Sequence, residues 1–380
     1  MTSRERVLAA LRREEVDYVP CCVAFNPLTP VQRRGHRWDF PWPASAPLEE
    51  RLAYQVERLG LDQVVAVGAD LCRPAPGVES RVWRDGDVLH KAYVTPAGDL
   101  HASVRYNELW PHGEDIPFFS DFNIGHFVEP WLETESDLAC LVHVRRLCDT
   151  DDVLAAVRAG FVAAKALADR YGLATIAHAG SGLTGAMQLC GATELCLLTI
   201  ENPGLVDAYL EHEHRTNLRT LEVLGELGVD VVRRNGFYET ADFYGPAMLD
   251  RFLGTRLRGE AAAAREAGMH MSYTVHTGVM PILDYLARLG MGSMFGIDIA
   301  AEGVDLRIVR DMLAPLTSFW TGPSSTFHLW QGPDATRRAV REVFDVLGTT
   351  GLVLCPCVSA HSIMPWDSTR AMIDEWRKRR

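Results

Sequence analysis

Glycine follows several helical segments of this chain, each time just before a short apolar run. The glycines concerned are Gly172, Gly228, Gly268, Gly290 and Gly348. Glycine is common at helix C-termini because it adopts positive φ without a Cβ clash. The apolar runs have the length and composition of buried strands. Helices that alternate with buried strands predict an α/β fold whose parallel strands are joined by right-handed crossovers.

The strands of this pattern can be counted along the whole chain. Eight fall near residues 19–24, 62–67, 173–178, 229–234, 269–275, 293–298, 316–321 and 351–356. Eight βα units that close on themselves form a TIM-type barrel. The alternative is an open, doubly wound sheet, but no Gly-x-Gly-x-x-Gly sequence follows the first strand. We therefore predict a single (β/α)8 barrel over residues 1–380.

Residues 80–106 depart from this alternation. Short apolar segments there are separated by polar turns such as Asp85-Gly86-Asp87 and Pro96-Ala97-Gly98-Asp99. Such turns between short strands are typical of antiparallel hairpins. We predict an antiparallel β insertion at about residues 71–150, between the second and third barrel strands.

Charge and composition restrict the partners and the compartment. The net charge of −12 argues against a broad basic surface, so we expect no nucleic-acid partner. The chain shows neither a run of about 18 apolar residues nor a signal-peptide core, so we expect no membrane association. Nine cysteines are too few for a disulfide scaffold in a chain of this size. We expect free thiols in a reducing cytoplasm.

Polar residues follow the predicted strands at their carboxyl ends, where barrels of this type carry their chemistry. In chain order they are Asn26, Asp70, His178, Ser181, Arg234, Asn235, Tyr238, Glu239, His276, Asp298, Cys357 and His361. Any one of them is equally well explained as a solvent-facing loop residue. Together they favour a site, because histidine, cysteine and carboxylates bind metals and transfer protons.

A zinc site can be assembled from this set. Zinc binds thiolate, imidazole and carboxylate, and a catalytic site needs three protein ligands and an open position. His276, Cys357 and one of Asp298 and Glu239 would supply them. Cys357 is preferred over Cys355 because Cys355 still lies within the apolar strand pattern. The alternative is that both cysteines are ordinary buried thiols.

Two further groups could bind anions. The Gly180-Ser181-Gly182 loop could hold an anion on backbone amides at the start of the next helix. Asp70 and the cluster Arg33, Arg34 and Arg37 could line a mouth that receives a carboxylated substrate. A common glycine-rich loop and a set of surface arginines are the alternative explanations.

The order of several motifs resembles the uroporphyrinogen decarboxylase superfamily. The similarity begins with residues 2–11 and Asp17-Tyr18-Val19-Pro20, and continues through Gly191-Ala192-Thr193-Glu194, Glu201-Asn202-Pro203 and Gly228-Val229-Asp230. It ends with residues 351–357 and His361-Ser362-Ile363. The resemblance implies a TIM barrel and a homodimer. It spans nearly the whole chain.

Two branches of that superfamily imply different chemistry. True uroporphyrinogen decarboxylases carry a Met-Arg-Gln-Ala-Gly-Arg element after the first strand, whereas residues 25–30 here read Phe-Asn-Pro-Leu-Thr-Pro and lack both arginines. The methylcobamide:coenzyme M methyltransferase-like branch binds zinc through a His-x-Cys pair and a later cysteine. His276 and Cys357 match two of these ligands, and Gly278 stands where the middle cysteine is expected.

The sequence therefore predicts a methyltransferase, zinc-assisted, that moves a methyl group between a small molecule or corrinoid and a thiol or similar acceptor. The corrinoid would be a co-substrate on a carrier protein. Tyr238, His178 and Asp70 would be catalytic, and the substrate would contact Asn26, Asn235, Arg234, Ser181 and His361. The alternative is a metal-free decarboxylase or other lyase acting on a carboxylated small molecule or porphyrinogen. A third possibility is a barrel that binds a tetrapyrrole without reacting it.

Overall fold

The computed structural model describes residues 1–26, 38–108, 110–119, 127–357 and 359–380. They form two compact units. The first contains residues 1–68, 158–179 and 221–380, and the second contains residues 69–157 and 180–220. The helices α4 (Asp151–Tyr171) and α7 (Pro203–Leu227) each begin in the second unit and end in the first.

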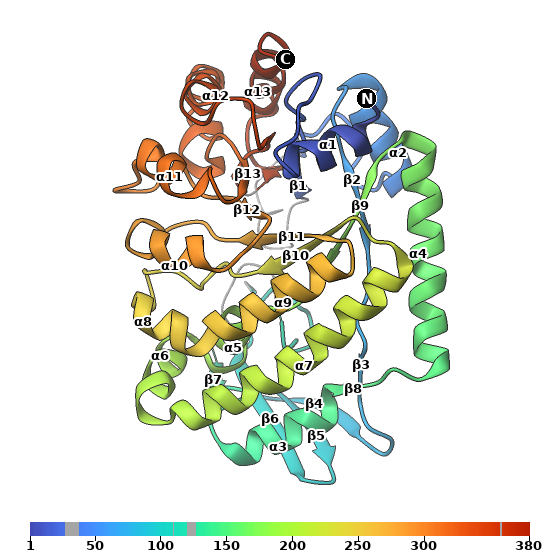
Figure 1. The fold of residues 1–380 in the computed structure, drawn as a ribbon. Coiled ribbons are helices and arrows are strands. Elements are labelled where there is room, and N and C mark those ends of the chain that lie inside the picture. Colours follow the sequence, from blue (N-terminus) through green and yellow to red (C-terminus); the bar gives the residue numbers. More distant parts are fainter. Residues whose placement is uncertain (27–37, 109, 120–126, 358) are drawn as a thin grey trace. The chain divides into compact units, whose positions relative to one another are not determined.

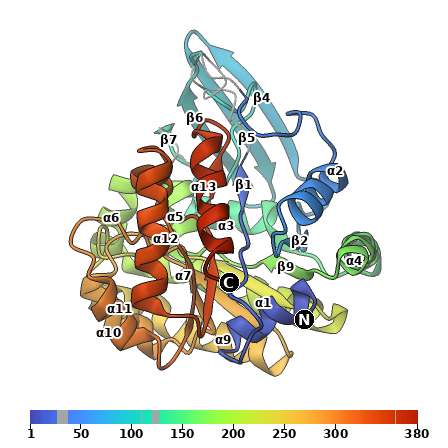
Figure 2. The same cartoon turned by 90° about the horizontal axis from the view of Figure 1, so that it is seen from above.

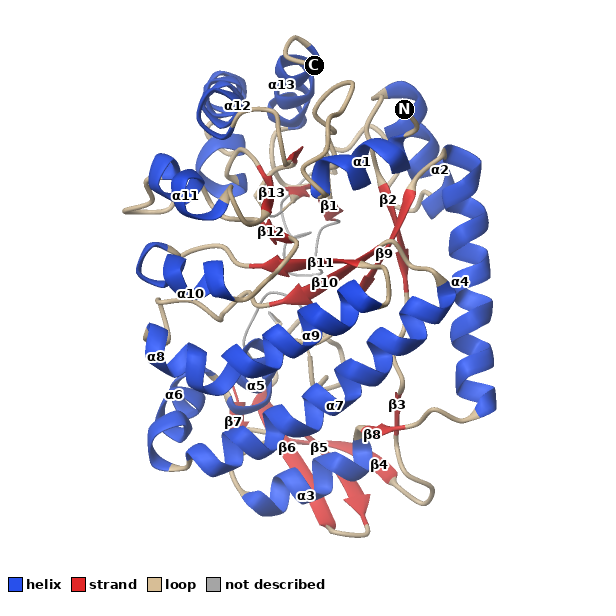
Figure 3. Cartoon of the chain, viewed as in Figure 1, coloured by secondary structure: helices blue, strands red, loops and turns tan. Residues whose placement is uncertain are grey.

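A seven-stranded parallel sheet forms the wall of the first unit (Figures 1 and 3). Its strands are β2 (Val64–Val67), β9 (Ala174–His178), β10 (Val231–Asn235), β11 (His270–Thr274), β12 (Ser293–Phe295), β13 (Ser318–Thr321) and β14 (Leu352–Leu354). They lie in the order β14-β13-β12-β11-β10-β9-β2, so each strand pairs with its successor in the barrel. The predicted α/β class and parallel pairing are confirmed.

A short segment at Pro20–Cys22 joins the two edges of this sheet. The Leu354 amide donates to the Pro20 carbonyl at 2.8 Å, and the Cys22 amide donates to the Leu354 carbonyl at 2.9 Å. On its other side, the Asp62 amide donates to the Cys21 carbonyl at 2.8 Å. The sheet thus closes as a TIM-type barrel. The predicted first strand is reduced to this bridge because Pro20 has no amide hydrogen with which to extend the ladder.

The segment after this bridge pairs with the segment that follows the last barrel strand. The strand β1 (Phe25–Asn26) lies parallel to β15 (Ala360–His361), with Asn26 opposite His361. The helices of the first unit besides α4 and α7 are α1 (Ser3–Leu11), α2 (Leu48–Ala53), α8 (Pro246–Leu249), α9 (Thr255–Glu266), α10 (Leu283–Arg288), α11 (Leu306–Leu313), α12 (Pro333–Leu347) and α13 (Trp366–Arg377). The last two run side by side (Figure 2), joined by Arg341–Glu375 and Arg379–Asp345 ion pairs.

The helix α1 covers the amino ends of the barrel strands. Ser3 donates to Asp62, just before β2, at 2.7 Å, and Arg4 pairs with Asp230, just before β10, at 2.6 Å. The apolar face of α1 packs into the barrel interior. Its buried residues Val7, Leu8 and Leu11 belong to one cluster with the inward-facing Ile176, Val231 and Val353. This end of the barrel is therefore filled with apolar side chains.

The second unit contains the antiparallel sheet that the sequence predicts between the second and third barrel strands. Its strands are β4 (Glu79–Asp85), β5 (Val88–Thr95), β6 (Gly98–Arg105) and β7 (Phe127–Glu129), paired in that order. The unit also holds the pair β3 (Cys72–Arg73) and β8 (Arg146–Leu147). Its helices are α3 (Glu135–Val144), α5 (Gly182–Cys190) and α6 (Ala192–Glu201). The predicted single-domain organisation, with its insertion at about residues 71–150, stays a prediction.

Within the described residues, no single helix has both the length and the hydropathy needed to cross a membrane. The helices α5 and α6 have the required length and hydropathy only when taken together, and the chain bends by 111° between them at Gly191.

Candidate functional site

A cavity of about 240 Å³ lies inside the first unit. The barrel strands contribute Ala66, Ile176, His178, Arg233, Phe295 and Trp320 to its wall, and the segments after the barrel bridge contribute Phe25, Asn26, Trp38, Phe40 and Trp42. Strand alternation explains the first group, because every second residue of a barrel strand faces inward. His178 and Arg233 are register partners on β9 and β10, so both point to this face.

Arg233 and His178 form the polar centre of the cavity wall. The Arg233 Nη2 donates to the His178 Nε2 at 3.1 Å, and its guanidinium lies 4.1 Å from the centre of the Phe295 ring. Burial, and then the Arg233 charge, lower the pKa of His178 to about 3, so this imidazole is neutral. Burial lowers the pKa of Arg233 to about 10, which leaves it charged at neutral pH. Both keep accessible surface because they face the cavity rather than the outside.

Asn26 and His361 meet beside the cavity through Ser359. The Asn26 Nδ2 donates to the Ser359 Oγ at 2.9 Å, and the His361 Nε2 lies 3.2 Å from the same oxygen. Burial lowers the pKa of His361. The structure thus brings these two predicted substrate-binding residues together, and Asn26 lines the cavity.

His276 and Cys357, predicted from the fifth and eighth strands, lie in contact. The Cys357 Sγ is 3.6 Å from the His276 Nδ1 and donates to the Gly296 carbonyl at 2.7 Å. The His276 Nδ1 donates to the same carbonyl, so Nε2 carries the lone pair, and it has no partner in the described part of the chain. Burial lowers the pKa of His276 to about 4 and raises that of Cys357 well above its usual range. The pair is therefore a neutral imidazole and a neutral thiol.

The two carboxylates predicted as further metal ligands have other partners. Asp298 accepts from the Ser324 Oγ and from the Ala300 amide, each at 2.9 Å. After burial, its charge is the next cause of the raised pKa of Cys357. Glu239 accepts from the Tyr273 hydroxyl at 2.5 Å and lies 3.6 Å from Arg234. Its side chain is fully buried.

Arg234 points to the outer face of β10, toward the helices. Its Nε pairs with Glu260 of α9 at 3.1 Å, and both side chains are 2% exposed. The predicted substrate-binding role thus falls on a residue that the structure places outside the cavity. The inward arginine of this strand is Arg233, which is not among the residues predicted for the site. Period-two alternation from the buried Val231 could have identified it.

Gly278 occupies the position where the resemblance implies a cysteine. Its φ is +59°, a conformation that side chains rarely adopt. A Cβ atom placed there would lie 2.7 Å from the Asp242 backbone nitrogen. The local backbone therefore excludes a ligand side chain at this position.

The other predicted residues of this barrel lie near its carboxyl ends or outside the described residues. The Asn235 Oδ1 accepts from the Phe237 amide at 3.2 Å, which orders the loop after β10. Tyr238 packs edge-on against Phe237 and Phe243, and Phe237 in turn packs on the ring of His276 at 4.3 Å. The cluster of Arg33, Arg34 and Arg37 lies outside the described residues.

Asp70 and Ser181 belong to the second unit. Asp70 accepts from the Cys72 amide at 2.9 Å and pairs with Arg145 at 3.4 Å. At the start of α5, the Ser181 amide and hydroxyl and the Gly182 amide all donate to the carboxylate of Glu213, at 2.6–3.0 Å. An internal carboxylate thus takes the place that an anionic ligand would need in this loop.

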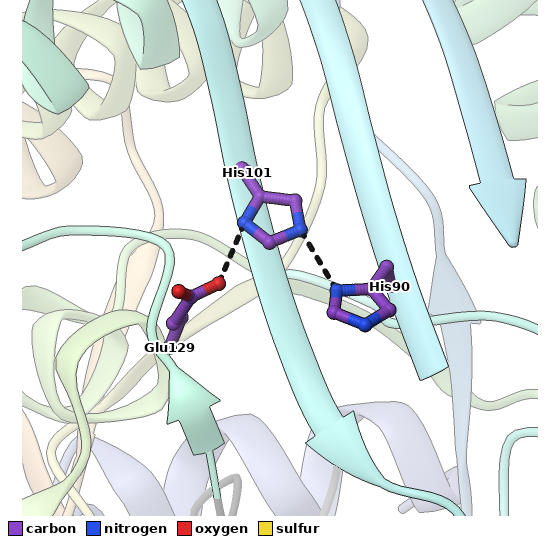
Figure 4. A group of neighbouring side chains, drawn as sticks. All are labelled: His90, His101 and Glu129. Carbon is purple, nitrogen blue, oxygen red and sulfur yellow. Dashed lines mark hydrogen bonds and ion pairs between the residues drawn. The ribbon is translucent and has the colours of Figure 1, made fainter. Parts of the chain in front are cut away.

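One group of potential metal ligands in the second unit was not predicted. His90 on β5, His101 on β6 and Glu129 on β7 place one ligand atom each within 4.8 Å of the others (Figure 4). The His101 Nε2 lies 3.2 Å from the His90 Nδ1, and its Nδ1 lies 2.9 Å from Glu129. We call this group the insertion triad. It is the one cluster of three such donors among the described residues.

The comparison with solved structures identifies the fold. The chain is similar to a methyltransferase from Methanosarcina mazei, with a TM-score of 0.59, 18% identity, and coverage of 100% of this chain and 99% of that one. The chain shares the fold of that protein, and its own strands form a TIM-type barrel. The fold that the resemblance in its sequence implied is confirmed.

Other comparisons are weaker. A B12-independent methionine synthase from Shewanella sp. W3-18-1 gives a TM-score of 0.43 at 10% identity, covering 95% of this chain and 98% of that one. A 3-keto-D-glucoside 4-epimerase from E. coli gives 0.38 at 13% identity, covering 58% and 85%. No protein-family model matches the sequence, and no curated protein matches it.

Proposed function

We propose that this chain is a methyltransferase that moves a methyl group between a small molecule bound in the barrel cavity and a corrinoid or thiol. The carrying observation is the contact between His276 and Cys357, which come from different strands to the carboxyl end of one barrel. The full-length likeness to the Methanosarcina mazei methyltransferase supports it. The corrinoid would arrive on a partner protein, and the working form would be a homodimer.

Methyl transfer by direct displacement needs little chemistry from the protein beyond alignment and exclusion of water. The cavity suits that task, because most of its wall is apolar, with Phe and Trp side chains from several segments. His178 and Asn26 would orient the small molecule, and His361 would orient Asn26 through Ser359. Tyr238 and Asn235 would act from the loop after β10. The roles of Asp70 and Ser181 stay predictions.

The zinc that the resemblance implies does not fit the barrel residues in this arrangement. His276 and Cys357 offer two donors in contact, whereas a catalytic zinc needs three protein ligands. Gly278 has no room for a third, and the carboxylates of Asp298 and Glu239 are engaged elsewhere. The proposed reaction therefore has no step through a metal in the barrel.

Zinc is expected to bind the insertion triad rather than the barrel. In chelator-treated protein titrated with zinc, His101→Gln should remove the bound equivalent, because His101 lies between the other two ligands. His276→Gln should leave the stoichiometry unchanged. Binding should weaken as pH falls through the histidine range, since protons compete for the ring nitrogens. Loss of zinc in His276→Gln instead would place the metal in the barrel.

Methyl transfer itself is tested with a methylated corrinoid and a thiol acceptor, in both directions. Cys357→Ser and His276→Gln are expected to lower the rate at least about tenfold, because each removes one half of the contact at the barrel mouth. Cys196→Ser on α6, which belongs to the other unit, is the matched control and should retain the wild-type rate. Wild-type rates in both barrel variants would contradict the proposal.

A second candidate is metal-free decarboxylation, favoured by the Arg233 guanidinium in the cavity wall. An arginine in this wall can hold a carboxylate, and the proton that replaces carbon dioxide would come from solvent, because the neutral His178 is too weak an acid to supply it. Release of carbon dioxide from a carboxylated substrate, with no transfer of a methyl group, would select this function over the first.

A further inference from the structure

We infer that the barrel cavity binds a small organic carboxylate with an apolar, planar remainder, and that Arg233 holds the carboxylate group. This inference deepens the proposed function. It rests on that function only where it identifies the bound carboxylate as the substrate. Binding itself follows from the cavity alone.

The cavity wall has positive charge and no negative charge among the described residues. Arg51 and Arg233 line it, and none of its lining residues is an aspartate or glutamate. Arg233 has no carboxylate within ion-pair distance among those residues, whereas its sequence neighbour Arg234 has two. A guanidinium surrounded by protein without a counter-ion is costly. An anionic ligand would supply what Arg233 lacks.

Two buried polar atoms on residues of the wall are further donors without an acceptor. The indole Nε1 of Trp320 and the Nε of Arg51 are buried, and neither has a hydrogen-bond partner in the described structure. The Arg233 guanidinium has five N–H groups, and the contact with His178 accounts for one of them. Donors without acceptors call for a ligand that brings acceptors. A carboxylate brings two oxygens and no donor.

The geometry of the wall favours a carboxylate over a larger oxyanion. A carboxylate is planar and pairs with a guanidinium through two parallel hydrogen bonds. The Phe295 ring lies 4.1 Å from the guanidinium and meets Trp320 edge-on at 5.5 Å. Phe25 and Trp42, 5.0 Å apart, line the cavity as well. Such a wall contacts flat apolar groups well and solvates a phosphate dianion poorly.

Benzoate, benzamide and inorganic phosphate are the probes. Their binding to the full chain is measured by calorimetry and by tryptophan fluorescence. We expect benzoate to bind at least about tenfold more tightly than its neutral isostere benzamide. Arg233→Gln should remove that preference, and Arg233→Lys should keep part of it. Arg12→Gln, at an exposed arginine outside the cavity, is the control and should bind like the wild type. Circular dichroism of each variant separates loss of binding from loss of folding.

Equal binding of benzoate and benzamide, or full benzoate binding in a folded Arg233→Gln, would overturn the inference. Phosphate binding without benzoate binding would also overturn it, because the site would then take inorganic anions. The measurement uses no methyl donor and no turnover. Benzoate binding in a chain that fails every methyl-transfer assay would uphold the cavity assignment and reject the proposed function, and the reverse result would do the opposite.

Discussion

Glu260→Ala is expected to lower the free energy of unfolding by about 3–5 kcal/mol. The substitution leaves the Arg234 guanidinium, 2% exposed, without its nearest carboxylate at 3.1 Å. Glu239 remains at 3.6 Å, but its carboxylate also holds the Tyr273 hydroxyl. The charge therefore stays buried and incompletely paired. Urea unfolding followed by circular dichroism measures the change.

An exposed ion pair near the same helix provides the control. Arg258 and Asp250 lie 3.3 Å apart with side chains 43% and 45% exposed. Asp250→Asn should cost less than about 1 kcal/mol, since solvent screens such pairs. Similar losses in Glu260→Ala and Asp250→Asn would mean that Arg234 escapes to solvent when its partner is removed. That result would contradict the buried network.

The free energy of unfolding of the first unit, which contains the barrel, is expected to fall as pH falls from about 6.5 to about 4. Burial lowers the pKa values of His270 and His276 to about 4 from an ordinary value of 6.5. In this window the unfolded chain binds protons that the folded chain does not, so acid favours unfolding. Each group contributes up to about 1.4 kcal/mol per pH unit. Below about pH 4 both states are protonated and the contribution stops changing.

Urea unfolding at several pH values between 7 and 4 measures this slope. His270→Gln should make it shallower by up to one proton's contribution, because Gln does not titrate while it can still bond Ser293, which His270 contacts at 3.0 Å. His178 contributes less to this slope because its ring faces the cavity, where solvent reduces the effect. A stability that is flat over this range in the wild type would show that the buried histidines gain protons without unfolding.

The alternation of glycine-ended helices and apolar runs was enough to predict the barrel. It placed seven strands, β2 and β9 to β14, within a few residues of their positions. It missed α5 and α6, where Gly191 at φ +93° ends one helix but is followed directly by a second helix and not by a strand. The first strand was also overestimated. The first strand pairs with segments far away in the sequence, and only closure of the barrel brings them together. A local sequence pattern does not show such pairing.

The candidate site was predicted less completely, for a physical reason. The side of a strand on which a residue lies depends on register, and a shift by one residue reverses every side chain. Arg233 and Arg234 are equally polar in the sequence, yet one faces the cavity and the other faces α9. The contact between His276 and Cys357 was anticipated from their places at the ends of the fifth and eighth predicted strands, and the resemblance implied the same two residues. The engagement of Glu239 by Tyr273 involves a contact that no sequence spacing indicates.

Because α1 fills the amino end of the barrel with apolar side chains, the interior is closed at that end. Ser3 and Arg4 fasten α1 to residues just before two strands, and Val7 and Leu11 fill the interior behind them. Among the described residues the amino end is filled, so a ligand would reach Arg233, and its product would leave, past the carboxyl ends of the strands. If a second reactant docks at the carboxyl ends of the strands, it blocks the entry and exit of the first reactant. A two-substrate reaction in this barrel would then follow a compulsory order, with the small molecule first in and last out.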